Sequence, residues 1–213
     1  EAGVPARFNV LDDRNASELM RASRDAVLQH AVLYDDSLKH AVSILATRAA
    51  DGRFAEIVDG AIGNTGRLRD IMAAHGNDEA RLFATLRETL NVGPHDDETN
   101  VLQNLCDELT DEREDLEAIA QWLIAGSSND RRSGTHLSNF LGAISSENFE
   151  SLRSLFLTTA GQPRKSLATK KSAEAQPALF DKLVDLSARV LSTDEKAKAA
   201  ATATLTEAIV TIA

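Results

Sequence analysis

The sequence predicts an all-α protein, an irregular bundle of about eight to ten helices. Three observations point to this class. Apolar residues recur with helical spacing along most of the 213 residues. Glycines, prolines and Asp or Asn cap residues divide the chain into segments of helix length. No stretch of useful length shows the apolar–polar alternation of a strand. Aromatic residues make up only 4% of the chain, so we expect a core built mainly from Leu, Ala, Val and Ile.

The first half of the chain divides into five expected helices. An extended lead-in at residues 1–11 precedes the first helix, which covers residues 13–33 and has Asp12 or Asp13 as its N-cap. Glycines, and a Gly-Pro pair after the fifth helix, separate the segments that follow. The other four helices are expected at residues 37–50, 54–62, 67–74 and 78–90, the last capped by Asn77.

The middle of the chain is predicted to contain a long helical segment and a loop. Residues 98–125 form one helix or two, with Thr110 as a candidate internal cap. Residues 126–134 are polar and contain two glycines, which indicates a loop. Two short helices are expected after this loop, at residues 136–144 and 148–157.

The last part of the chain is predicted to hold a long loop and two further helices. The loop runs for about 18 residues to Gln176. Pro177 suits the first turn of a helix, which we expect to end at residue 191. Ser192 and Glu195 have the Ser-x-x-Glu spacing of a capping box, which predicts the start of a final helix at residues 193–213.

Charge is segregated along the chain. The formal net charge is −10, which argues against a general nucleic-acid binder if the charge is spread evenly. Residues 94–118, here named the acidic stretch, contain ten acids and only Arg113 as a base, a local charge of −9. Residues 151–173 contain no acid and five bases, a local charge of +5. Four of these bases lie in "GQPRKSLATKK", residues 161–171, here named the basic strip.

No motif in the sequence predicts catalysis or a bound cofactor. The glycine-rich segment at residues 60–68 lacks the Lys-Ser/Thr pair and the preceding strand of a phosphate-binding loop. The five histidines are scattered, and Cys106 stands alone, so no zinc ligand set is visible. We interpret Cys106 as a small buried apolar residue and Trp122 as part of the core.

The acidic stretch allows three interpretations. A solvated helix face is the simplest, because carboxylates act as acid–base pairs only when their environments separate their pKa values. A face that docks a partner protein and a carboxylate metal site remain alternatives.

One cysteine excludes an internal disulfide and fits a cytoplasmic setting. No run of about 18 apolar residues occurs, so we expect no membrane partner.

Three stretches of the sequence resemble one family. "FNVLDDRNASELMRASRDAVL", residues 8–28, resembles the UvrD-type superfamily 1 helicases, in which an extended segment leads into a helix just after the early motifs of the first motor domain. "LFLTTAGQPRKSLATKK", residues 155–171, resembles the AddA branch, the helicase–nuclease subunits of bacterial double-strand-break repair. Residues 193–213 resemble the helix that returns to that motor domain. Residues 35–150 carry little of the resemblance.

The resemblance implies that residues 1–213 form a single helical subdomain, the 1B insertion of the first motor domain. The parent enzyme would use ATP and Mg²⁺ to unwind DNA, with the remaining helicase domains of the same chain and an AddB-like subunit as partners. None of the family's ATP-binding or nuclease residues has a counterpart here, so we expect no activity and no cofactor in this chain alone. The absence of a starting Met and of a helix stop signal near residue 213 also leads us to expect a piece of a larger protein.

In related helicases this subdomain lies near the duplex and helps to grip it. The resemblance therefore makes five residues candidate contacts for the phosphates of duplex DNA: Arg153, Arg164, Lys165, Lys170 and Lys171. Three alternatives remain for the basic strip: a mobile solvated loop, a loop docked on an acidic surface such as residues 94–118, or a contact with another domain or subunit. For the whole chain, the alternative function is a free-standing helical interaction module that docks partners on residues 94–118. An enzyme with a carboxylate metal site in residues 94–118 is a third.

Overall fold

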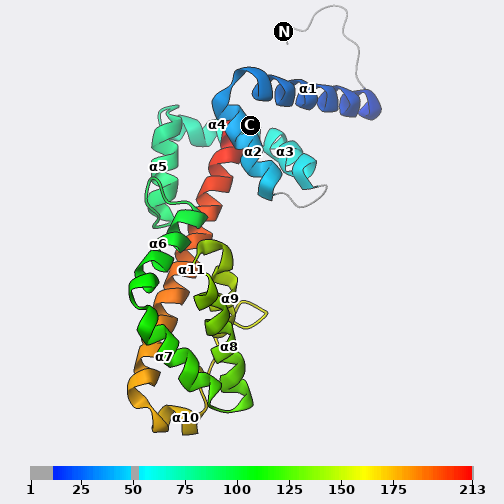
Figure 1. Cartoon of the computed structure of the whole chain (residues 1–213). Helices are drawn as coiled ribbons and strands as arrows, with labels where there is room; N and C mark the ends of the chain where they lie inside the picture. Colours follow the sequence, from blue (N-terminus) through cyan, green and yellow to red (C-terminus); the bar gives the residue numbers. More distant parts are fainter. Residues whose placement is uncertain (1–11, 49–52, 213) are drawn as a thin grey trace, which may run out of the picture. The chain divides into compact units, whose positions relative to one another are not determined.

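The computed structural model describes residues 12–48 and 53–212 (Figure 1). Within these ranges the chain forms eleven α-helices, α1 to α11, and one short 3-10 helix, with no strand. The all-α prediction is confirmed. The expected lead-in at residues 1–11 lies outside the described residues.

The contacts divide the chain into two units, residues 1–79 with 204–213, and residues 80–203. Helix α11 (Pro177–Ile212) contributes residues to both. The expectation of a single subdomain over residues 1–213 stays a prediction, because a division by contacts does not measure whether the two units unfold together.

The first unit contains α1 (Asp13–Tyr34), α2 (Asp36–Arg48), α3 (Arg53–Gly63) and α4 (Thr65–Ala74). Asp12 caps α1, since its carboxylate accepts a hydrogen bond from the Asn15 N–H at 2.8 Å. A small buried cluster joins α2 and α3 to the end of α11; its members are Ala41, Leu45, Val58 and Ala208.

The second unit contains the larger core and every residue of the basic strip. Its helices are α5 (Glu79–Thr89, whose first residue falls in the other unit), α6 (Glu98–Asp111), α7 (Arg113–Ile124), α8 (Ser128–Gly142), α9 (Phe149–Phe156), α10 (Lys170–Ala175) and α11, with the 3-10 turn Ser146–Asn148 before α9.

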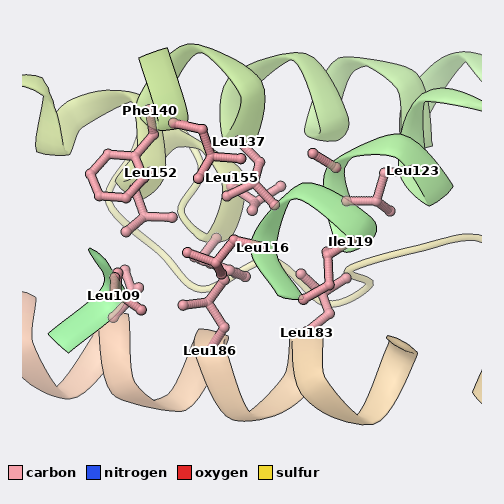
Figure 2. Close-up of a cluster of buried hydrophobic side chains, with 14 of the residues drawn as sticks. Leu109, Leu116, Ile119, Leu123, Leu137, Phe140, Leu152, Leu155, Leu183 and Leu186 are labelled. Atoms are coloured by element: carbon pink, nitrogen blue, oxygen red, sulfur yellow. The ribbon is translucent and has the colours of Figure 1, made fainter. Parts of the chain in front are cut away.

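Apolar side chains, mostly Leu, from α6 to α9 and α11 fill this core (Figure 2). Figure 2 labels Leu109, Leu116, Ile119, Leu123, Leu137, Phe140, Leu152, Leu155, Leu183 and Leu186. Burying one such side chain stabilises the fold by about 1.5–3 kcal/mol, so this cluster fixes α8 and α9 in place. Cys106 is fully buried, as expected, and burial followed by the charge of Asp107 raises the pKa of its thiol to about 11. Trp122 packs against the same cluster, which confirms its assignment to the core.

The loop predicted at residues 126–134 is largely wrong, because α8 begins at Ser128. Ser127 and Asp130 form a capping box: the Ser127 hydroxyl accepts from the Asp130 N–H, and the Asp130 carboxylate accepts from the Ser127 N–H. Gly134 does not end a helix but allows α8 to approach α7 closely. A Cβ at this position would lie 2.7 Å from Ile124 Cγ1 and 2.8 Å from the Ala120 carbonyl oxygen.

The predicted helix start at Ser192 is also wrong, since α11 continues through it. Val190, Asp194 and Ala197 are all buried at helical spacing across this point, so packing holds the helix unbroken. The capping signal in the sequence is therefore overridden by burial.

Two predicted caps need smaller corrections. The break between α6 and α7 falls at Glu112, while the Thr110 hydroxyl donates back to the Cys106 carbonyl at 2.9 Å instead of capping a helix. Asn77 lies two residues before α5 and has a left-handed backbone, with φ at 57°, so it belongs to the turn after α4.

Candidate nucleic-acid interface

The first half of the basic strip is a tight turn fixed to the end of α9. Leu157 and Pro163 form an isolated antiparallel bridge. The Thr158 N–H donates to the Gln162 carbonyl, and the Arg164 N–H to the Phe156 carbonyl, each at 2.8 Å. Gly161 supplies the positive φ, 71°, that the turn requires. The backbone of Arg164 is thus held against α9.

A single buried carboxylate fixes the second half of the strip. Asp130, on α8, is 2% exposed. It accepts hydrogen bonds from the Thr169 N–H at 2.8 Å, the Thr169 hydroxyl at 2.7 Å and the Ser172 hydroxyl at 2.8 Å. Because residues 169 and 172 flank Lys170 and Lys171, this carboxylate positions both lysines. The predicted long loop is therefore wrong in its last part, where residues 170–175 form α10.

Opposing effects set the pKa of Asp130. Burial raises it, while hydrogen bonds from Thr169, from Ser172 and from the Ser127 backbone lower it by more. The result is a pKa of about 2, so the carboxylate is ionised at neutral pH. The donors that hold the strip are hydroxyl and backbone N–H groups, so no lysine is needed to neutralise this charge.

The five predicted DNA contacts are not equally available. The Arg153 guanidinium on α9 pairs with the buried Asp194 at 3.0 Å and with Glu150 at 3.3 Å. Lys170 lies 3.7 Å from Glu174, an exposed pair of small energetic weight. Lys165 and Lys171 are exposed and make no hydrogen bond or ion pair with the described residues. Their DNA-binding role stays a prediction, as does that of the other three residues.

Two adjoining cavities lie where α8 and α9 meet the turn and the strip, with volumes of about 230 and 360 Å³. Arg164 lines both, and Arg153 lines the second. The structure thus brings these two predicted residues together, while Lys165, Lys170 and Lys171 line neither cavity.

Two further residues of these cavities were missed from sequence. Arg132 and His136 line both cavities, and they stand four residues apart, on one face of α8. The signal was present as Arg-x-x-x-His, but the expected loop at residues 126–134 placed Arg132 off the helix. The capping box of Ser127 and Asp130 would have revealed it.

Four acids of the acidic stretch form ion pairs with Lys and Arg side chains of α11. Lys196 lies 2.8 Å from Asp96, and Lys182 lies 2.7 Å from Asp115. The guanidinium of Arg189 contacts Glu112 at 2.8 Å and Glu108 at 3.2 Å. No base of the strip pairs with this stretch in the described parts of the chain, so the strip is not docked on it.

The described residues also bear on metal and membrane sites. Among them, no group of three or more His, Cys, Asp and Glu side chains gathers as it would around a metal ion. None of the described helices combines the length and the apolar character needed to cross a membrane. A scan against protein-family models and searches of curated proteins and of solved structures found no match to this chain.

Proposed function

We propose that this chain binds the backbone of duplex DNA through the basic strip, as a DNA-positioning helical subdomain of an AddA-like helicase–nuclease. One observation carries the proposal: Lys165 and Lys171 are exposed and without a carboxylate partner among the described residues, on a segment whose backbone is held by α8 and α9. The resemblance of residues 155–171 to the AddA branch supports it.

The chemistry suits a translocating enzyme. Lys and Arg side chains that contact phosphates release counterions and read no base sequence. A held backbone limits the conformational entropy lost when the side chains meet DNA. The parent enzyme would supply ATP hydrolysis with Mg²⁺, the other motor domains and an AddB-like subunit, and would work in the cytoplasm on broken chromosomal DNA. The chain itself would carry no catalytic step.

The alternative function, a module that docks a partner protein on the acidic stretch, is less favoured because part of the negative charge of that stretch is already paired within the chain. Asp96, Glu108, Glu112 and Asp115 are already matched by cations of α11. These pairs hold helices of one unit together, which is a structural use of the acids.

Salt-dependent binding to a forked duplex tests the proposal. Fluorescence anisotropy of the chain at several salt concentrations should show weak binding that is independent of sequence. Changing Arg164, Lys165, Lys170 and Lys171 to Ala should weaken it and reduce the slope of log K against log salt by up to about 3.6. Equal binding of the variant and the unchanged chain at low salt would exclude the strip.

A charge-matched control separates a local contact from net charge. The side chains of Lys39 and Arg67 are exposed and make no hydrogen bond or ion pair within the described ranges. The pair Lys39→Ala and Arg67→Ala removes the same charge as Lys165→Ala and Lys171→Ala. The control should leave DNA binding within twofold, whereas the strip pair should weaken it several-fold. Equal effects of the two pairs would show that only net charge matters.

A further inference from the structure

The two adjoining cavities differ from the rest of the strip in their charge. Three guanidinium groups line them, those of Arg132, Arg153 and Arg164. Two carboxylates also line them, those of Asp130 and Glu150. The positive charges therefore outnumber the negative ones. Which guanidinium groups are available to a ligand depends on which of them already pair with a carboxylate.

Two of the cations are left without a carboxylate. Arg153 is matched by Asp194 and Glu150, and the Asp130 charge is satisfied by the hydroxyl and N–H donors already described. The Arg132 side chain makes no hydrogen bond or ion pair with any described residue. Arg164 donates from one terminal nitrogen to the Ser154 carbonyl at 3.2 Å, which leaves its other N–H donors available.

Further hydrogen-bond donors surround these two arginines. The imidazole of His136 lines both cavities, is half-buried, and has no hydrogen-bond partner in the described structure. Ser133 and Thr158, which carry hydroxyls, line one cavity each; Ser154 lines both, but its hydroxyl donates to the Glu150 carboxylate at 3.4 Å. Donors at several angles around two cations suit an anion with acceptor oxygens on all sides.

A phosphate group suits this set of donors. A guanidinium presents a planar fork of N–H groups that matches two phosphate oxygens. The lining residues include no Phe, Tyr or Trp and only three apolar side chains, Leu157, Leu167 and Ala168, so no large aromatic ring is available as a stacking platform for a nucleobase.

We propose that these two cavities form a binding site for a single phosphate group, held by Arg132 and Arg164 with His136 as a further donor. The phosphate comes either from the DNA backbone or from a free phosphate ion. The DNA source rests on the proposed function, while the site itself does not. Arg132 and His136 extend the candidate interface from the strip onto α8.

Titration with inorganic phosphate alone tests the site. In ¹H–¹⁵N NMR spectra of the whole chain, phosphate should shift the signals of residues 132, 136, 154 and 164. Arg132→Ala should weaken phosphate binding at least tenfold. Arg131→Ala is the control for charge, because Arg131 is the adjacent arginine of α8 and lines neither cavity. It loses one hydrogen bond, from Arg131 Nε to the Ile124 carbonyl, so its spectrum must also show that it is folded, and it should change binding less than twofold. No shift at the site, or equal weakening by both variants, would overturn the proposal.

Arg132 is the informative position because its removal breaks no hydrogen bond in the described structure. Arg132→Ala should therefore fold, which its NMR spectrum away from the cavities would verify. Arg132→Lys keeps the charge and loses the fork, so it should restore binding only in part. Full restoration would overturn the bidentate assignment.

A second titration, with a duplex that lacks terminal phosphates, identifies the source. If DNA shifts the same signals and Arg132→Ala weakens DNA binding, the site holds a backbone phosphate. If phosphate binds but DNA leaves these signals unchanged, the site stands with a free phosphate as its ligand. Lys165→Ala with Lys170→Ala and Lys171→Ala tests the proposed function separately, because these residues lie outside both cavities. The two proposals are therefore tested by different variants, and a negative result for one does not decide the other.

Discussion

The acidic stretch and the basic strip are both runs of like charge in the sequence, but in the fold the first is partly paired with opposite charges and the second is largely unpaired among the described residues. Four acids of residues 94–118 meet cations of α11. The strip is fixed by a turn and by a carboxylate that accepts from hydroxyl and backbone N–H donors, so two of its lysines have no carboxylate partner among the described residues. A run of like charges in a sequence therefore does not indicate a binding surface until its internal counter-charges are known.

The internal counter-charges of the acidic stretch come from far along the chain. Arg189 lies 77 residues from Glu112 and 81 from Glu108, so no local pattern indicates the pairing. The Glu112 carboxylate, with smaller contributions from Glu108, raises the pKa of the Arg189 guanidinium further above its ordinary value, although partial burial opposes this. Similarly, hydrogen bonds from Lys196 and from the Gly93 N–H lower the pKa of Asp96. The acids thus serve packing between α6, α7 and α11.

The largest expected effect comes from removing the carboxylate that fixes the strip. Asp130→Ala leaves the Thr169 and Ser127 N–H groups without their acceptor and should reduce the free energy of unfolding by about 3 kcal/mol. Asp111→Ala, on the acidic stretch, is the control and should change it by less than about 0.5 kcal/mol. Urea unfolding measures both. Equal values would show that Asp130 does not fix the strip.

Acid should weaken the Asp130 contacts that fix the strip. The folded pKa of Asp130, about 2, lies below its ordinary value of 3.8. Its stabilisation is therefore complete above about pH 4 and is lost as the pH falls from about 4 to about 2, by about 2 kcal/mol. The difference in unfolding free energy between the unchanged chain and Asp130→Asn should shrink over this interval. A difference that is constant with pH would contradict the assignment.

A smaller effect is expected from the central cation of the acidic stretch. Arg189→Met keeps an apolar stem but leaves Glu108 and Glu112 without their partner. Because these carboxylates are 64% and 44% exposed, solvent screens the pairs, and we expect a loss of about 1 kcal/mol. The loss should be smaller in 0.5 M NaCl than in 20 mM NaCl. Urea unfolding that gives the same loss at both salt concentrations would argue for packing rather than charge.

The smallest effect on stability is expected in the strip itself. Lys165→Ala with Lys171→Ala removes two charges that contact nothing in the described structure and should change the unfolding free energy by less than about 0.5 kcal/mol. Thermal unfolding should be unchanged. A loss of more than about 1 kcal/mol in the unfolding free energy would show that these lysines stabilise the fold, as Arg189 is expected to do.

The sequence predicted the features that depend on local order. Helical periodicity, the cap at Asp12 and the +5 segment follow from residues close together in the chain. The predictions from sequence were wrong where packing between helices determines where a helix begins or ends. Gly134 looked like a break but serves the close approach of α7 and α8, and burial of Val190 and Ala197 carried α11 through a capping signal. Arg132 was missed for the same reason, since its role depends on a helix start and on a turn some 30 residues away.

The Asp130 contacts also bear on the order in which the chain folds. Their partners lie 39 and 42 residues along the sequence, so the entropy of closing a long loop opposes them until α7, α8 and α9 have already packed. We therefore expect the strip to order only after α7, α8 and α9 have packed. On a ribosome, the lysines would reach their final positions only once residue 172 has emerged, so a shorter chain would hold α7, α8 and α9 without their basic surface and without the α11 side chains that complete the core.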